Sequence, residues 1–166
     1  MNSWIAAILF LFLTIQVAYC QLNSSVPQPL LQVMFWNAEN FFDTFNDNSV
    51  NDDEFLPGTL RAWNYKKYET KRNHIYQVIA AIGGWDPPDI IGLAEVENRF
   101  VLNDLVSNTP LAKYNYRIVH KNSPDPRGID VALLYREDRF RLIDRRFFPI
   151  YDANGKIERT REILYA

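Results

Sequence analysis

The sequence contains a single cysteine, Cys20, among its 166 residues. One cysteine excludes a disulfide framework, and it also excludes a zinc site built from cysteine ligands. The fold must therefore be stabilised by a hydrophobic core. The length and the 48% hydrophobic content are enough for one globular domain with such a core.

Charged side chains are absent before Glu39, and residues 4–17 are almost wholly apolar. This run is shorter than the ~20 residues that cross a membrane, and it is typical of a secretory signal peptide. We therefore predict a signal peptide at residues 1–20, a linker at residues 21–29 and an exported or secreted protein whose mature form has no transmembrane span. A second interpretation takes Cys20 as the lipidated residue of a lipobox and predicts a lipid anchor.

A strong excess of either charge is also absent, since the formal net charge is −2. The whole chain is therefore not a general binder of polyanions. The distribution is uneven: residues 39–58 hold six acids and no Lys or Arg, whereas residues 111–166 hold 12 Lys and Arg against 8 Asp and Glu. An acidic loop and a basic second half could serve one site that binds a metal and a phosphate, although ordinary solvated loops explain the same pattern.

The hydrophobic pattern predicts strands and helices in alternation. Residues 64–82 repeat apolar side chains at helical spacing and end at Gly83-Gly84, which predicts the main helix. Strands at residues 30–37 and 90–94 flank it and complete a βαβ-like unit. The remaining predictions are a helix at residues 99–107 and short antiparallel strands at residues 114–120, 129–135, 139–143, 147–151 and 162–165.

The strand predicted at residues 90–94 is the most informative segment. It follows the Pro87-Pro88 break, and its short isoleucine-containing run suits a strand buried on both faces. Glu95 would then lie at the carboxyl end of a buried strand, where open α/β sheets bind their ligands. A carboxylate is costly there unless it binds a cation, a proton or a hydrogen-bond donor. The pattern therefore marks Glu95 as a candidate binding residue.

Four segments together carry a resemblance to a known family. They are FWNAENFFD at residues 35–43, DIIGLAEV at residues 89–96, RGIDVALLYR at residues 127–136 and TREILY at residues 160–165. As a set, over roughly residues 31–166, they resemble the endonuclease/exonuclease/phosphatase superfamily, and most closely its secreted bacterial branch. The resemblance implies an α/β fold: a four-layered α/β sandwich of two packed mixed sheets flanked by helices.

The resemblance also implies an activity and a site. Members of the superfamily cleave phosphate esters with a divalent cation, so Mg²⁺ or Mn²⁺ is the expected cofactor and a phosphodiester, above all nucleic acid, the expected substrate. Asn37 and Glu95 match the two N-terminal metal-site positions, and their oxygens are the ligand type that Mg²⁺ prefers. Arg161 matches a position where family members often present a basic residue to substrate phosphate, since a guanidinium can give two parallel hydrogen bonds. Arg127, which precedes a predicted strand, could bind phosphate in the same way. No stable protein partner is implied.

Part of the family pattern is missing. The superfamily's general-base or phosphate-binding His, its Asp-x-Asn pair and its final Asp-His pair would all lie beyond Ala166, and neither His74 nor His120 stands in a matching motif. Ala94 replaces the usual Gln before the metal-binding Glu. Residues 30–166 are therefore expected to be the N-terminal part of such a domain, a partial sandwich with its C-terminal half missing, and inactive alone. No catalytic residue is assigned within the chain.

Two other functions fit parts of the sequence. Glu95 and Glu97 would share one face of a strand at ~7 Å, which lies between the carboxyl separations of retaining and inverting glycosidases. A non-catalytic exported binding protein needs no missing half. In that case residues 21–166 would unfold in one cooperative transition.

Overall fold

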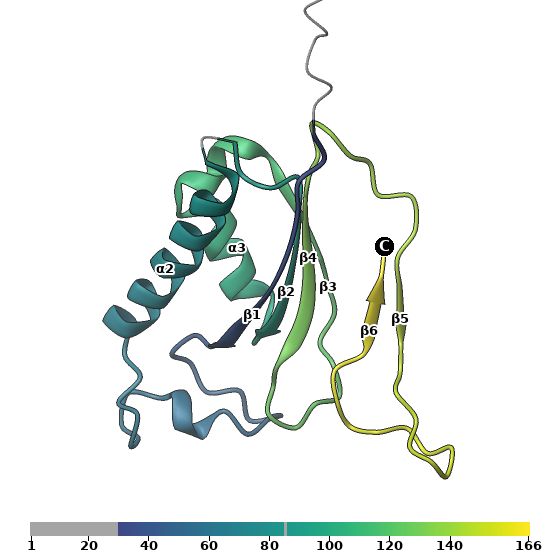
Figure 1. The fold of residues 1–166 in the computed structure, drawn as a ribbon. Coiled ribbons are helices and arrows are strands. Elements are labelled where there is room, and N and C mark those ends of the chain that lie inside the picture. The colour runs from purple at the N-terminus through teal and green to yellow at the C-terminus, as the bar shows by residue number, and fades with distance from the viewer. Residues whose placement is uncertain (1–29, 85) are drawn as a thin grey trace, which may run out of the picture. The chain divides into compact units, whose positions relative to one another are not determined.

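A computed structural model of the protein describes residues 30–84 and 86–166. The predicted signal peptide, the linker and Cys20 lie outside these residues and remain predictions. Residues 32–166 form one compact unit, in which the helices cover one face of the main sheet and a strand pair lies on the other (Figure 1). Among the described residues, no helix is long and apolar enough to span a membrane.

The elements follow the predicted order closely. The helices are α2 (Tyr65–Gly83) and α3 (Arg99–Ser107), with short 3-10 turns η1 (Asp53–Phe55) and η2 (Pro110–Tyr114). The strands are β1 (Val33–Phe41), β2 (Ile90–Val96), β3 (Tyr116–His120), β4 (Asp130–Arg136), β5 (Arg146–Phe148) and β6 (Ile163–Tyr165). The α/β class is confirmed.

The main sheet has the strand order β1-β2-β4-β3. Strands β1 and β2 pair in parallel and are joined through α2, which confirms the βαβ-like unit. Strand β4 runs antiparallel to both β2 and β3, so the sheet is mixed. In the described residues the second sheet holds β5 and β6, which pair antiparallel, as in a partial sandwich.

The hydrophobic core fills the space between the helices and the sheet. Ile75 and Ile79 of α2 and Leu102 of α3 are fully buried against Ile91 and Leu93 of β2. Both helices begin at an asparagine whose side-chain oxygen accepts a backbone N–H of the first turn, which satisfies one of the free donors there. After α2, Gly84 takes a positive φ of 65°, a conformation that glycine adopts without strain.

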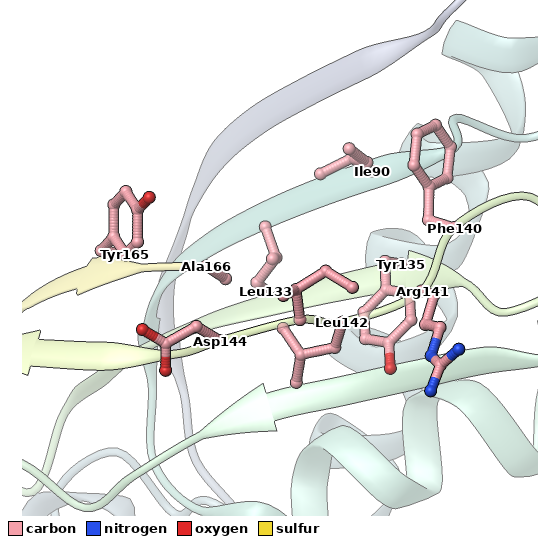
Figure 2. Close-up of a pocket in the computed structure, with 10 residues that line it drawn as sticks. Ile90, Leu133, Tyr135, Phe140, Arg141, Leu142, Asp144, Tyr165 and Ala166 are labelled. Atoms are coloured by element: carbon pink, nitrogen blue, oxygen red, sulfur yellow. The ribbon is translucent and has the colours of Figure 1, made fainter.

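The opposite face of the sheet is also apolar. A pocket of about 380 Å³ lies there, and Figure 2 shows Leu133 and Tyr135 of β4 beside Ile90 of β2 and Tyr165 of β6. Because β5 and β6 are short, they cover this face only in part, and Phe35 of β1 remains 74% exposed.

The strand predicted at residues 139–143 is wrong. These residues form no strand, because the backbone N–H groups of Arg139 and Phe140 both bond to the carbonyl oxygen of Arg136 in the turn that ends β4. The strand predicted at residues 147–151 is shorter than expected: β5 ends at Phe148, and Tyr151 forms only an isolated bridge to Ile157.

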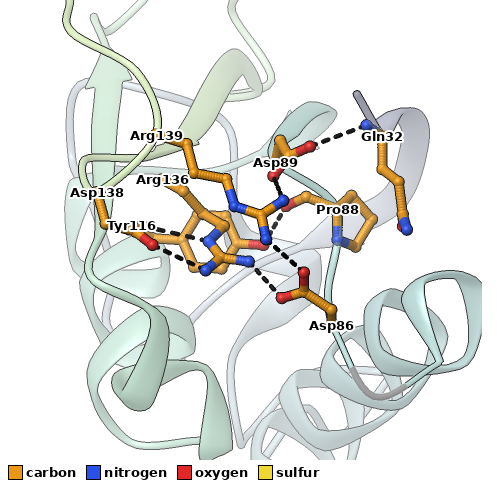
Figure 3. Close-up of polar contacts among 8 residues, drawn as sticks. All are labelled: Gln32, Asp86, Pro88, Asp89, Tyr116, Arg136, Asp138 and Arg139. Atoms are coloured by element: carbon orange, nitrogen blue, oxygen red, sulfur yellow. Dashed lines mark hydrogen bonds and ion pairs between the residues drawn. The ribbon is translucent and has the colours of Figure 1, made fainter. Parts of the chain in front are cut away.

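An ion-pair network uses the same turn to fasten the amino end of β2 (Figure 3). Arg139 bonds to Asp89 at 2.5 Å and to Asp86 at 2.6 Å. The other carboxylate oxygen of Asp89 accepts the backbone N–H of Gln32 at 2.9 Å. Arg136 also pairs with Asp86, so Asp86 joins the two arginines while Asp89 links them to the start of β1.

Asp89→Ala tests this network. Asp89 is 2% exposed, and its removal leaves the part-buried backbone N–H of Gln32 without its acceptor and takes away one of the two carboxylate partners of Arg139. We expect a loss of roughly 2–4 kcal/mol in the free energy of unfolding by urea denaturation. Asp86→Ala is the control: that side chain is 47% exposed, and the loss should stay below about 1 kcal/mol. Equal losses in both variants would contradict the assigned role of Asp89.

Candidate functional site

Strands β1 and β2 are both irregular at their carboxyl ends. Their register shifts between Asn37 and Phe41 on β1, and β2 shifts against β4 between Ala94 and Val96. Three non-glycine residues in these shifts have positive φ angles: Glu39 at 53°, Asn40 at 66° and Glu95 at 60°. Such backbone strain costs on the order of 1–3 kcal/mol per residue and clusters at functional sites.

The bulge in β2 changes the direction of Glu95. In a regular strand, Leu93 and Glu95 would point to the same face, and Glu95 would enter the core beside α2. Instead Val96 takes the core position and is fully buried, while the Glu95 side chain is 18% exposed at the strand end. The extra residue therefore lets Val96 fill the apolar core and places the carboxylate of Glu95 at the carboxyl end of β2.

Asn37 lies on the neighbouring strand, directly opposite Ala94 in the parallel register. Its side chain is exposed, and its Oδ1 accepts the backbone N–H of Glu39 at 2.8 Å. An amide oxygen has two lone pairs, so one remains for a ligand. The structure thus brings Asn37 and Glu95 to adjacent positions at one end of the sheet.

Both candidate arginines lie near Glu95. Arg161 Nη1 approaches Glu95 Oε1 at 3.3 Å, and 28% of its side chain is exposed. Arg127 pairs with Asp125 at 2.9 Å, and its charge also interacts with Glu95. Burial raises the pKa of Asp125, but the hydrogen bonds from Arg127 outweigh burial, and the pKa of Asp125 is lowered. The pair therefore stays ionised at neutral pH.

Lys71 of α2 is a third cation at this site, which the sequence assigned only to the polar face of a helix. Its Nζ donates to the carbonyl oxygen of Glu39 at 3.3 Å. Burial lowers the pKa of Lys71, and the nearby charges of Glu39 and Glu95 oppose that shift. Only the crossing of α2 over β1 reveals this placement, so no local motif could have shown it.

The loop between β3 and β4 carries Arg127 and is held by a buried pair. His120 Nε2 lies 2.7 Å from Asp130 Oδ2, and each side chain is only 3% exposed. The other oxygen of Asp130 accepts the backbone N–H of Ser123 at 2.7 Å. The sequence left open whether Asp130 pairs with Arg127 or serves the site; its partners are His120 and Ser123, so it positions this loop.

A second acidic group lies behind the strand ends. Glu97 is 6% exposed, and its Oε2 accepts the backbone N–H of Asp43 at 2.6 Å. Burial raises the pKa of Glu97 to about 8, and the charges of Asp43, Asp52 and Asp47 contribute. Glu97 follows the end of β2, while Glu95 lies in the bulge, so the two do not share a strand face. The geometric basis of the glycosidase hypothesis therefore fails.

The donor set at the strand ends fits a hard divalent cation in part. Glu95 offers a carboxylate that already attracts the cation of Arg161, and Asn37 offers an amide oxygen; both are oxygen ligands of the kind that Mg²⁺ binds. Within residues 30–84 and 86–166, no group of three or more His, Cys, Asp or Glu side chains is arranged to hold a metal ion. Two protein oxygens would leave most coordination positions to water and substrate.

A mixed α/β fold with a carboxylate, an amide and three cations at the strand ends suits the binding of an anionic ester. Comparison with known proteins agrees: residues 32–166 match the model of the Endonuclease/Exonuclease/phosphatase family, and the chain belongs to this family. A search of curated proteins found no match. Family membership indicates hydrolysis of phosphate esters or phosphodiesters, and the family is generally dependent on divalent metals.

Glu97→Gln tests the buried carboxyl group. The folded protein holds the Glu97 proton up to a pKa of about 8, whereas the unfolded chain releases it near 4.5. Wild-type stability should therefore fall as pH rises between these values. Gln does not ionise, so we expect Glu97→Gln to gain stability over wild type progressively, by roughly 1–3 kcal/mol at pH 8 and by little at pH 4. Urea denaturation over this pH range measures the difference.

Glu137→Gln is the matched control, because this side chain is 50% exposed and pairs with Arg117 at the surface. Its difference from wild type should stay nearly constant across the same range. A Glu97→Gln difference that is equally flat would show that Glu97 is ionised in the folded protein.

Replacing Glu95 by glycine and by alanine tests the strained bulge. Both changes remove the carboxylate, but only glycine tolerates the φ of 60° without strain. We expect Glu95→Gly to be more stable than Glu95→Ala by about 1 kcal/mol in thermal or urea unfolding. At Arg117, an exposed position within β3, the order should reverse. If alanine is the better residue at both positions, the bulge does not have the strained form described.

Proposed function

We propose that this protein is a divalent-metal-dependent phosphodiesterase, and most specifically a secreted nuclease. The observation that carries the proposal is the bulged, strained Glu95, held at a strand end beside Asn37 with three cations around it. Arg161, Arg127 and Lys71 offset the charges of Glu95, Asp125 and Glu39, so a bound divalent cation would leave the site net positive, which suits an anionic substrate. Secretion rests on the sequence of residues 1–20, and a lipid anchor at Cys20 is its alternative.

Asn37 and Glu95 are the residues that would hold the metal, Mg²⁺ or Mn²⁺. When bound, the ion would neutralise charge that develops on the phosphoryl oxygens. The part of Glu95 is to provide the anionic ligand at a fixed place, since the bulge and the buried Val96 leave its backbone little freedom. Asn37 would add a neutral oxygen, which would not reduce the positive charge of the bound ion.

Arg161 and Arg127 would bind the substrate phosphate. Arg161 makes one long contact of 3.3 Å to Glu95, which leaves most of its five N–H donors available. Arg127 is 58% exposed, and Asp125 holds its guanidinium in one orientation through two hydrogen bonds. A guanidinium fixed in this way can give two parallel hydrogen bonds to phosphate oxygens with little further ordering.

The proton-transfer group has no candidate among these residues. His120 is bonded to Asp130 and is nearly buried, so it cannot reach a substrate at the strand ends. By resemblance to the family, we propose that the general base is supplied by a longer in-frame product that contains this chain. The activity assay therefore uses the longest such product, and metal binding is measured with the chain itself.

The test has two readouts. Calorimetric titration with Mn²⁺ should show binding that Glu95→Gln weakens at least tenfold, because the only charged ligand is lost. Hydrolysis of plasmid DNA and of a chromogenic phosphodiester should stop in EDTA and return with Mg²⁺. Glu137→Gln, at the far end of the sheet, should preserve both. Hydrolysis unaffected by EDTA would refute the metal dependence, and full activity of Glu95→Gln would refute the assignment of Glu95. Metal and phosphate binding without hydrolysis would favour the non-catalytic binding protein.

A further inference from the structure

A groove of about 430 Å³ lies along the first half of α2. Its lining is basic, and no carboxylate takes part in it. The residues are Trp63, Asn64, Lys66, Lys67, Thr70, Lys71 and His74. In a protein with a formal net charge of −2, three lysines in one groove are a local concentration of positive charge.

In the described residues, none of the three lysines is paired directly with a carboxylate. Lys67 Nζ donates to the backbone carbonyl of Arg61 at 2.6 Å, and Lys71 Nζ donates to that of Glu39. None of the three forms a salt bridge with a carboxylate in the described part of the chain. Lys66 and Lys67 are exposed, so their charges face solvent.

The three lysines form one stripe along α2, namely Lys66, Lys67 and Lys71, and this arrangement slightly destabilises the helix. Lys67 and Lys71 are four residues apart and face the same side, where like charges weaken a helix slightly. The first turn of α2 holds lysines and no acid, although the positive end of the helix dipole favours acids there. The opposite side of the helix packs into the core through Tyr68, Ile75 and Ile79. Helix formation alone does not explain this distribution, which points to a role for the stripe outside the helix.

The stripe leads to the candidate site. Lys71 lies close enough to Glu95 and Glu39 for their charges to interact. Figure 1 shows that α2 starts at the same end of the sheet where β1 and β2 finish. Lys71 therefore belongs both to the groove and to the cations around Glu95. From Lys71 the groove runs along the helix towards Lys66.

We propose that this groove binds the phosphodiester backbone of a nucleic acid next to the phosphate held at Glu95. The inference rests on the proposed nuclease function and adds the surface that would hold the polymer beside the cleaved phosphate. Residues 66–74 cover ~12 Å of helix axis, which matches roughly three or four phosphates of one strand. Lysine suits this role because its ammonium group binds a phosphate as a point charge, and contacts to phosphate do not depend on the base sequence.

The experiment compares two double variants of the full chain. Lys66→Ala/Lys67→Ala removes the exposed part of the stripe, and alanine favours the helix. Lys113→Ala/Lys156→Ala is the matched control, since both lysines are exposed and neither lines the groove. Fluorescence anisotropy with a labelled DNA duplex in EDTA measures affinity as a function of salt. The groove variant should bind at least tenfold more weakly and should reduce the slope of log K against log salt by about two, while the control keeps both values.

Hydrolysis separates this inference from the function itself. Hydrolysis is measured with the longest in-frame product, in which the groove variant should cleave the small chromogenic phosphodiester as fast as wild type and plasmid DNA more slowly. Equal DNA affinity and salt slope for wild type and the groove variant would overturn the inference and leave the phosphodiesterase proposal intact. Binding of wild type to anionic phosphatidylserine vesicles with no binding to DNA would also overturn it. Failure of the longest in-frame product, with these residues unchanged, to hydrolyse either substrate would instead refute the proposed function.

Discussion

The backbone hydrogen bonds between β1 and β2 hold the two strands in parallel register, from Val33 with Ile90 to Asn37 with Ala94. A parallel pair needs a long crossover, and α2 provides it. Because α2 must return across β1 to reach β2, its apolar side forms the core with β2, and its lysines are left on the outside. The same register sets Asn37 next to the residue before Glu95. Core, site and basic groove therefore all follow from one strand pairing.

The site combines strain with charge. A regular β2 would bury Glu95 against the helices, where an unpaired carboxylate costs several kcal/mol. The bulge avoids that cost in exchange for one strained residue and places the carboxylate among Arg161, Arg127 and Lys71. Two residues further on, Glu97 is buried without such cations, and its pKa rises. Two glutamates of one segment thus have opposite environments, which separates a candidate ligand from a structural acid.

Much of the fold could be predicted because it depends on local pattern. The helical repeat of residues 64–82, its Gly83-Gly84 end and the buried run at residues 90–94 all appear where expected. The prediction of a strand at residues 139–143 was wrong because Arg139 and Phe140 form the turn after β4, and Arg139 also pairs with Asp89. Of the site, Glu95 lies close to the end of its strand as expected, whereas β1 continues to Phe41, so Asn37 lies within β1, where the register with β2 breaks. The bulges, Lys71 and the His120–Asp130 pair were not predicted, because each depends on how distant segments meet.

Net charge is a poor guide to what this protein binds. The formal value of −2 argues against a general polyanion binder, yet the acids and bases occupy different places. Asp43, Asp52 and Glu97 are buried behind the strand ends, where protein groups screen them from a ligand. Lys66 and Lys67 are exposed on α2, and most of Arg127 is exposed in its loop. Exposed acids are present as well, and Glu39 lies close to Lys71. The field that steers a substrate depends on how the surface charges are distributed near the site, which the formal net charge of the whole chain does not describe.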